Sequence, residues 1–325
     1  MDSVKEELRR RLPESTEPAI EKMGSAKDDM GSIPGQVFRR MPDGTKPLVQ
    51  HGYHILNPGA SWENMRRRER TRKHFKKLIG NEEYDRLSTE FFDESGITDI
   101  VISAIKEVGD EKVVFDTHRG VASHVYALIR TQKPDRIVST GVYSGVGTAS
   151  ILLALDKNNH GMLHTVDASL TRGTVNRTRG GSDSIRELDF VERGRPSCSE
   201  HRSHELPPGK EPGWIIPDRL RERWESRHGF PQDVLPELYT ELPKIDMFYH
   251  DSGHSKSGML FEFELAWNWL KPGGMLISPH IDQNDAFGVF VNEHDCHHGL
   301  IEHDYLASSE YDEPCSCGYA VKLKN

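Results

Sequence analysis

The clearest ligand-binding pattern in this sequence is a group of glycines, Gly141, Gly145 and Gly147. Glycine has no Cβ atom, so the chain can turn sharply there and a ligand can approach the backbone closely. The β-branched pair at 137–138 precedes the group, and apolar residues at helical spacing follow over 151–155. Because the first N–H groups of a helix suit a polar or anionic group, the stretch predicts a strand, a binding loop and a helix.

Asp167 ends a second short strand-like run, about 20 residues after the last glycine. A carboxylate at this place in a strand–loop–helix–strand unit is suited to holding ribose hydroxyls. The pattern therefore predicts a ligand that contains a nucleoside. The alternative is that the glycines serve only the close packing of a helix against a strand.

Two further polar clusters follow apolar runs that have the character of buried parallel strands. The run over 245–249 leads into Asp251 and His254, and the run over 275–278 leads into His280, Asp282 and Asn284. Since neighbouring parallel strands end at the same edge of a sheet, we expect both clusters to face one ligand. Imidazole, carboxylate and amide groups can bind a metal ion or move a proton. Alternatively, these histidines cap the strand ends with satisfied hydrogen bonds.

The glycine spacing separates two kinds of nucleoside site. A dinucleotide fingerprint needs a third glycine where this chain has Ser150. The spacing G-x-x-x-G-x-G instead resembles motif I of the class I S-adenosylmethionine-dependent methyltransferases, although those enzymes usually have an acid where this chain has Ser139. The resemblance implies that the cofactor is S-adenosylmethionine, cradled by Gly141, Tyr143, Ser144, Gly145, Gly147 and Thr148, with Asp167 at its ribose.

The stretch IDMFYHDSGHSKSGMLFEFELAWNWLKPGGMLISPH resembles the O-methyltransferase branch related to the catechol, macrocin and cephalosporin-pathway enzymes. This resemblance implies that Asp251 contacts the cofactor and a divalent cation and that His254 is the general base. It also implies adenine contacts at Gly229, Phe230 and Gln232, and metal ligands among Asp251, His280, Asp282 and Asn284. The cation would be Mg²⁺ or Mn²⁺. The chain has Pro279-His280 where relatives have an acid pair or an acid and an amide, and a mixed His and carboxylate set favours Mn, Fe or Zn.

These elements predict an α/β fold: a doubly wound, Rossmann-like, seven-stranded methyltransferase sheet with an antiparallel C-terminal hairpin and an N-terminal helical extension. We expect a loosely ordered segment over 1–44, a helical extension or cap over 45–111 and the methyltransferase domain over 112–325. A long insertion over 168–213 is either a substrate lid, with Arg172, Arg177 and Arg179 available to the substrate, or a disordered insertion.

Composition narrows the class of partner. The 325 residues carry a net charge of −9, which disfavours a general nucleic-acid binder, and no apolar run approaches the length of a membrane span. Four cysteines without a disulfide framework indicate a cytoplasmic protein. The basic residues over 66–77 form either an anion or nucleic-acid contact or a solvated helix face.

We therefore expect methyl transfer from S-adenosylmethionine to a hydroxyl of a small molecule, with Asp251 and His254 as catalytic residues and with metal assistance. The alternatives are a catalytically silent module that binds S-adenosylmethionine and a nucleotide-binding oxidoreductase. The sequence is compatible with both a monomer and a homo-oligomer.

Overall fold

The computed structural model describes residues 58–109, 119–168, 170–171, 205–302 and 316–324. The chain divides into two compact units at Arg72, within the helix α5 (Pro58–Ile79). The larger unit, residues 73–301 and 316–325, contains the sheet and the predicted site. The predicted segment over 1–44 and the arginines proposed for a lid lie outside the described residues.

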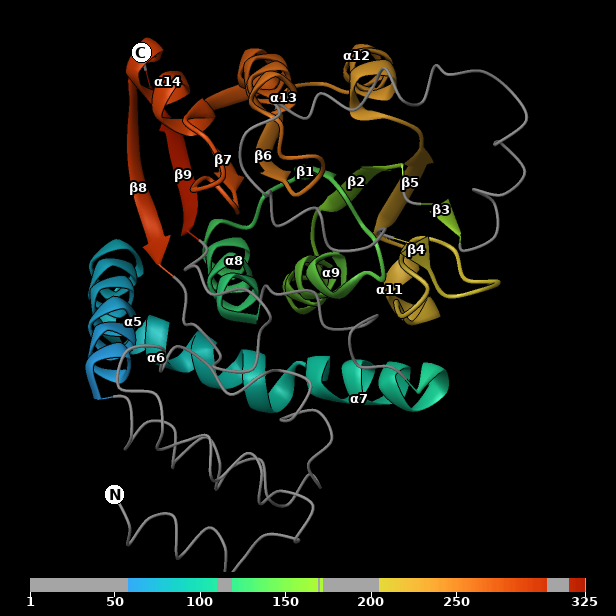
Figure 1. Ribbon diagram of the computed structural model, residues 1–325, viewed down its shortest axis with the longest axis horizontal. Coiled ribbons are helices and arrows are strands. Elements are labelled where there is room, and N and C mark those ends of the chain that lie inside the picture. Colours follow the sequence, from blue (N-terminus) through green and yellow to red (C-terminus); the bar gives the residue numbers. More distant parts are fainter. Residues whose placement is uncertain (1–57, 110–118, 169, 172–204, 303–315, 325) are drawn as a thin grey trace, which may run out of the picture. The chain divides into compact units, whose positions relative to one another are not determined.

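A seven-stranded sheet with the order β5-β2-β1-β6-β7-β9-β8 organises this unit (Figure 1). Pairing is parallel among the first five strands of that order, and β9 is antiparallel to β7. This confirms the predicted doubly wound sheet, including the reversed C-terminal strand. The strands are β1 Arg136–Thr140, β2 Met162–Asp167, β5 Trp224–His228, β6 Ile245–His250, β7 Leu270–Ser278, β8 Cys296–Glu302 and β9 Ser316–Lys322.

The order of the strands determines where a ligand can sit. From β1 the chain moves outward through β2 to β5, and it then returns to place β6 on the other side of β1. In such a sheet the carboxyl ends of β1 and β6 border a crevice, because the connections that leave them go to opposite faces. The predicted glycine loop follows β1, and Asp251 follows β6 directly.

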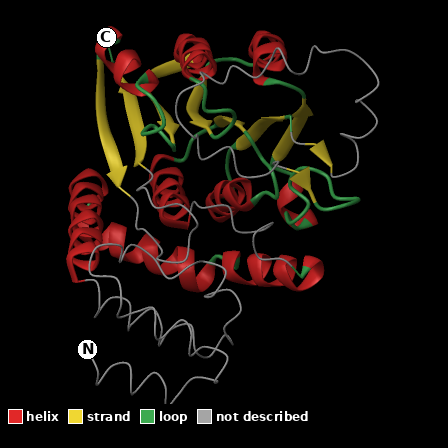
Figure 2. Ribbon diagram, in the orientation of Figure 1, coloured by secondary structure: helices red, strands yellow, loops and turns green. Residues whose placement is uncertain are grey.

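Helices cover both faces of the sheet (Figure 2). The helices α8 (Arg119–Gln132) and α9 (Val146–Asn158) lie on one face, and α12 (Pro231–Glu241), α13 (Lys256–Trp269) and α14 (Ala286–Glu293) lie on the other. Successive strand residues point to opposite faces: Ile137 and Met247 join the core under α8 and α9, whereas Val138 and Phe248 join the core under α12 to α14. Both faces are therefore buried, which explains the near-continuous apolar runs in the sequence.

The N-terminal helices of this unit pack beneath α8 and α9. They are α6 (Asn81–Thr89), the π-helical turn η3 (Glu90–Glu94) and α7 (Ile97–Val108). Buried Glu90 joins them to α8, since it accepts hydrogen bonds from Tyr126 (2.5 Å) and Arg130 (2.6 Å). These helices thus belong to the unit that holds the sheet. The domain limits expected from the sequence stay a prediction.

The connection from β2 to β5 departs from a regular helix crossover in its described parts. It contains β3 (Leu170–Thr171) and β4 (Glu205–Leu206), which pair with each other outside the main sheet, and the short helix α11 (Asp218–Arg221). Among the residues that the structure describes, none of the helices is long and apolar enough to cross a membrane.

Candidate functional site

The glycine loop joins β1 to α9 and lies against the loop that follows β6. Gly141 has a φ of +80°, and a Cβ atom placed there would be 1.9 Å from the backbone oxygen of Asp251. Gly145 has a φ of +105°, and its Cβ would be 2.9 Å from the Cα of Gly213. These two glycines are therefore required by close packing. A Cβ at Gly147 would have no atom within 4 Å, so that position is open.

Asp167 is brought directly to this loop, as the sequence predicts. Its Oδ2 atom accepts hydrogen bonds from the backbone N–H groups of Val142 (2.5 Å) and Tyr143 (3.0 Å). Tyr143 has a positive φ of +49°, which turns the loop toward the carboxylate. Asp167 thus fixes the loop conformation, in addition to any part that it takes in binding a ligand.

The three residues expected to contact adenine lie at the same edge of the sheet. The N–H of Gly229 donates to the backbone oxygen of Asp167 (2.9 Å), so the end of β5 is tied to the end of β2. Phe230 is 43% exposed, and Gln232 is exposed in the first turn of α12. An exposed aromatic ring that follows the end of β5 is a suitable surface for a nucleoside base.

The two polar clusters meet across the ends of β6 and β7. One oxygen or nitrogen atom from each of Asp251, His254 and His280 lies within 4.8 Å of the others, and all three side chains are half-buried. The rings of His254 and His280 are 4.6 Å apart between centroids and nearly perpendicular, at 80°. His280 has a left-handed φ of +58°. The structure therefore groups His254, expected to be a base, with two of the expected metal ligands.

The other two expected metal ligands make backbone hydrogen bonds in the loop after β7. Asp282 Oδ1 accepts from the N–H of Ser316 (2.8 Å). Asn284 Oδ1 accepts from the N–H of Ala286, and its Nδ2 donates to the backbone oxygen of His254 (2.8 Å each). These side chains hold the loops of the cluster in place, and they are not among its three grouped ligand atoms.

A buried carboxylate that sequence reasoning missed supports the cluster from α13. Glu262 is 3% exposed, and its Oε2 accepts from Thr140 Oγ1 (2.6 Å) and contacts His250 Nδ1 (2.8 Å). Its Oε1 accepts from Ser252 Oγ (2.6 Å). The carboxylate thus joins the ends of β1 and β6 next to Asp251. The signal was available, because Glu262 lies between buried Met259 and Phe263 and Ala266 on the apolar side of the helix.

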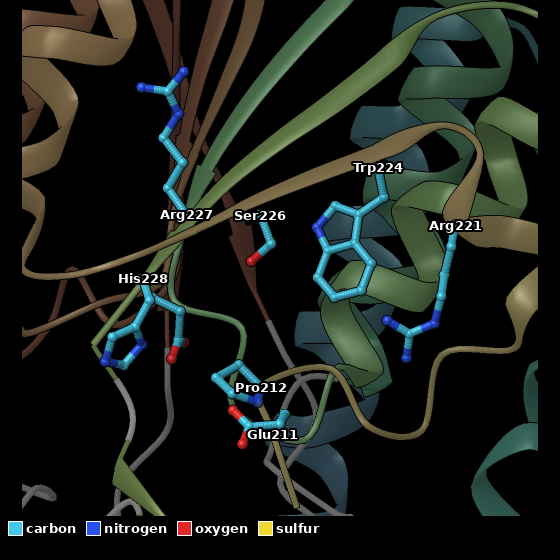
Figure 3. A pocket seen from close by; sticks show the side chains of 8 residues that line it. Glu211, Pro212, Arg221, Trp224, Ser226, Arg227 and His228 are labelled. Atoms are coloured by element: carbon cyan, nitrogen blue, oxygen red, sulfur yellow. The ribbon is translucent and has the colours of Figure 1, made fainter.

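A cavity of about 320 Å³ lies along the edge strand β5 (Figure 3). Trp224, Ser226 and His228 face it, whereas the Arg227 side chain extends to the other side of the strand and pairs with Glu241. Of the predicted site residues that the structure describes, only Asp167 lines the cavity, which therefore lies beside the ribose end of the expected ligand site. The lining consists of Asp167, Glu211, Pro212, Arg221, Trp224, Ser226, Arg227 and His228.

The segment that precedes α11 packs against the glycine loop. Gly213 N–H donates to the backbone oxygen of Tyr143 (2.8 Å), and Ile215 N–H donates to that of Ser144 (3.4 Å). Both contacts join residues about 70 positions apart in the chain, so no local sequence pattern predicts them. The described end of the predicted insertion is therefore part of the site. The arginines Arg172, Arg177 and Arg179 lie outside the described residues.

Comparison with known proteins agrees with this architecture. Residues 138–278, from β1 to the end of β7, match the model of a family described as a methyltransferase domain. This region, which is less than half of the chain, is therefore similar to a methyltransferase domain. No curated protein matches the chain.

Solved structures that are similar to the chain include two O-methyltransferases. An O-methyltransferase from Bacillus cereus in complex with SAH is 15% identical, with 69% of this chain and 91% of that chain covered and a TM-score of 0.46. The O-methyltransferase TomG from Streptomyces achromogenes, involved in tomaymycin synthesis and in complex with SAM, is 14% identical, with 71% and 91% covered and a TM-score of 0.45. These scores are low, so the fold assignment rests on the strand order of the chain itself.

Proposed function

We propose that this protein transfers a methyl group from S-adenosylmethionine to a hydroxyl oxygen of a small molecule. The observation that carries the proposal is the meeting of two groups at the crevice between β1 and β6. The glycine loop with Asp167 forms one side, and Asp251, His254 and His280 form the other. Gly141 joins the two, because its Cα lies against the backbone of Asp251.

The first group suits the cofactor. In the proposal the loop over 141–148 faces the amino-acid part, Asp167 accepts hydrogen bonds from the ribose, and Gly229, Phe230 and Gln232 border adenine. Asp251 follows the strand that completes the crevice. A carboxylate at the tip of the second strand is the acceptor that a ribose diol needs.

The second group suits the acceptor. Methyl transfer breaks the bond from sulfur to the methyl carbon, forms a bond from oxygen to that carbon and releases the hydroxyl proton. The cluster of Asp251, His254 and His280 offers groups that can hold the acceptor oxygen and take up this proton. A divalent cation bound here would lower the pKa of the acceptor hydroxyl. Holding the methyl carbon and the oxygen in line can lower the activation free energy by about 7–11 kcal/mol.

A small acceptor is favoured over a polymer. The net charge of −9 opposes binding to nucleic acid. We propose that the protein acts in the cytoplasm, on the basis of its cysteine content. The identity of the acceptor depends on side chains around the crevice, which the fold does not determine.

The proposal is tested by calorimetric titration of the full-length protein with S-adenosylmethionine. We expect one site, and we expect Asp167→Asn to weaken binding by about 10-fold or more, since a charge-assisted hydrogen bond contributes about 1.5–3 kcal/mol. Asparagine keeps an oxygen for the loop N–H groups, so the variant separates ligand binding from loop structure. Asp135→Asn, on the exposed surface, is the control.

Each outcome has a definite meaning. Failure of well-folded protein to bind S-adenosylmethionine would contradict the proposal, and a change in nicotinamide absorbance would then indicate an oxidoreductase. Binding without methyl transfer to any compound in a panel of phenols and other hydroxyl compounds would favour the catalytically silent module.

A further inference from the structure

We infer that Asp251, His254 and His280 form a binding site for a divalent transition metal ion, such as Mn²⁺, Fe²⁺, Co²⁺ or Zn²⁺, and that this site discriminates against Mg²⁺. The inference deepens the proposed function, and its meaning for catalysis rests on that function. The binding of the metal can be measured without any methyl transfer.

The geometry of the three side chains is close to that of a metal site. Two ligand atoms bound to one ion at about 2.1 Å each lie at most about 4.2 Å apart. The grouped atoms of Asp251, His254 and His280 are already within 4.8 Å of one another, so small rotations of the side chains bring them together. The ligands come from the ends of two neighbouring strands, β6 and β7, which are held by the sheet itself.

The donor atoms determine which ion is suited to the site. Mg²⁺ prefers an octahedron of oxygen atoms, many of them from water, whereas imidazole nitrogen suits Zn, Cu, Fe and Ni. The cluster offers two imidazoles and one carboxylate. Asp282 and Asn284 are the nearby side chains that could add oxygen ligands. The Oδ1 atom of each accepts a backbone hydrogen bond, from Ser316 and Ala286 respectively. The set of donors therefore disagrees with a magnesium site.

The backbone holds His280 in the orientation that the cluster needs. Its φ of +58° places it in the left-handed region, which histidine adopts more readily than most residues. The next two residues are fixed to the start of β9: Ile281 N–H donates to the backbone oxygen of Ser316 (3.1 Å), and the Ser316 N–H donates to Asp282 (2.8 Å). This pair of hydrogen bonds, in opposite directions, keeps the turn from relaxing.

The backbone at His254 is also fixed, by a hydrogen bond to the loop after β7 and by the start of α13. The His254 backbone oxygen accepts from Asn284 Nδ2 (2.8 Å), which ties the loop after β6 to the loop after β7. The following residue, Ser255, is the N-cap of α13, and its Oγ accepts from the N–H of Gly258 (3.2 Å). Two histidines fixed on opposite loops with rings 4.6 Å apart make a site that needs little reorganisation on binding.

This assignment changes the role expected for His254. A nitrogen that binds the ion is not available to take a proton, so His254 acts as a ligand, and the proton of the acceptor hydroxyl would pass to solvent water. Three protein ligands leave coordination positions open for water or for an acceptor oxygen.

The experiment uses the full-length protein after removal of metals with a chelator. Co²⁺ is added while its visible absorption is recorded, and Mg²⁺, Mn²⁺ and Zn²⁺ are titrated by calorimetry. We expect one Co²⁺ site with an affinity at least about 100-fold higher than that for Mg²⁺, because imidazole ligands favour the later transition metals. Asp251→Asn, His254→Gln and His280→Asn should each weaken Co²⁺ binding by about 10-fold or more.

The controls separate this site from the other histidines. His160→Gln removes an exposed histidine that pairs with Asp135, and it should leave Co²⁺ binding unchanged. Asparagine at position 280 tolerates the left-handed conformation, and thermal unfolding of each variant shows whether it is folded. Comparable Mg²⁺ and Co²⁺ affinities, unchanged Co²⁺ binding in the three variants, or no Co²⁺ binding would each overturn the inference.

S-adenosylmethionine binding is measured on the same preparation. Cofactor binding without a metal site would overturn this inference and leave the proposed function intact. A metal site without cofactor binding would support this inference and contradict the proposed function.

Discussion

Glu262 illustrates how one side chain can hold a site without touching a substrate. Its two oxygens accept hydrogen bonds from Thr140 and Ser252 and contact His250, and Thr140 and His250 are fully buried. Replacement of the carboxylate leaves these buried polar groups without their acceptor, which is more costly than the net contribution of a satisfied hydrogen bond.

We expect Glu262→Ala to lower the free energy of unfolding by about 3 kcal/mol, because several buried polar groups lose their partner at once. Denaturant unfolding measures the change. Glu264→Ala is the matched control on the same helix: Glu264 is partly exposed and pairs with His294, so its loss should cost about 1 kcal/mol or less. Equal effects of the two substitutions would contradict the role given to Glu262.

His254 is expected to matter for turnover rather than for cofactor affinity. We expect His254→Ala to lower kcat by about 100-fold or more, whether the imidazole binds a metal or accepts a proton. The dissociation constant for S-adenosylmethionine, measured by calorimetry, should change by less than about 2-fold, since the cofactor site lies on the Asp167 side of the crevice. Turnover like that of the unaltered protein would exclude His254 from the mechanism.

At the scale of elements, the unit from β1 to α9 couples the two halves of the site. Gly141 is the contact point, because its Cβ would overlap the backbone oxygen of Asp251 at 1.9 Å. A side chain there must push the end of β1 away from the loop after β6. Gly147, two residues beyond Gly145, meets no such obstacle.

The two glycines give a paired prediction. Gly141→Ala should destabilise the protein by about 2 kcal/mol or more, from both the overlap and the left-handed φ. Gly147→Ala should be neutral or stabilising by up to about 1 kcal/mol, because alanine is a better helix former. Thermal unfolding of both variants checks this, and a stability loss at Gly147 as large as that at Gly141 would refute it.

Local patterns predicted these elements well where periodicity and glycine spacing determine structure. The strand–loop–helix unit before Asp167 and the burial of β6 on both of its faces follow from residue order alone. The cavity along β5 and the contact of Gly213 with Tyr143 could not be predicted, because they join segments far apart in the chain. Nor did the pattern after β7 distinguish His280, which faces the cluster, from Asp282, which binds Ser316.

At the scale of the whole molecule, a buried ionic group helps to hold the N-terminal helices α6 to α7 against α8, beside their apolar contacts. Glu90 in η3 bonds to Arg130 and Tyr126 of α8, and Arg86 of α6 also donates to it (2.8 Å). Burial alone would raise the pKa of Glu90, but the hydrogen bonds from Arg130, Tyr126 and Arg86 outweigh it and lower the pKa to about 2.

This shift sets a pH range for the stability of the unit. Since the pKa of Glu90 is lower in the folded state, its contribution is present in full above the ordinary value of 4.5 and is lost as the pH falls toward about 2. Glu90→Gln should lower the free energy of unfolding by about 3 kcal/mol at pH 7, because it leaves Arg130 without its charged partner. The difference between the variant and the unaltered protein should shrink as the pH is lowered through that range.

Denaturant unfolding at a series of pH values measures this effect, and Glu94→Gln, exposed in the same turn, is the control. The control should follow the unaltered protein at every pH, because the Glu94 side chain is exposed. A pH-independent gap for Glu90→Gln would mean that the glutamine is destabilising by its shape rather than by its lost charge. The attachment of the N-terminal helices would then depend on their apolar contacts, such as those of Phe91, Ile97 and Val101, and not on the ionic group.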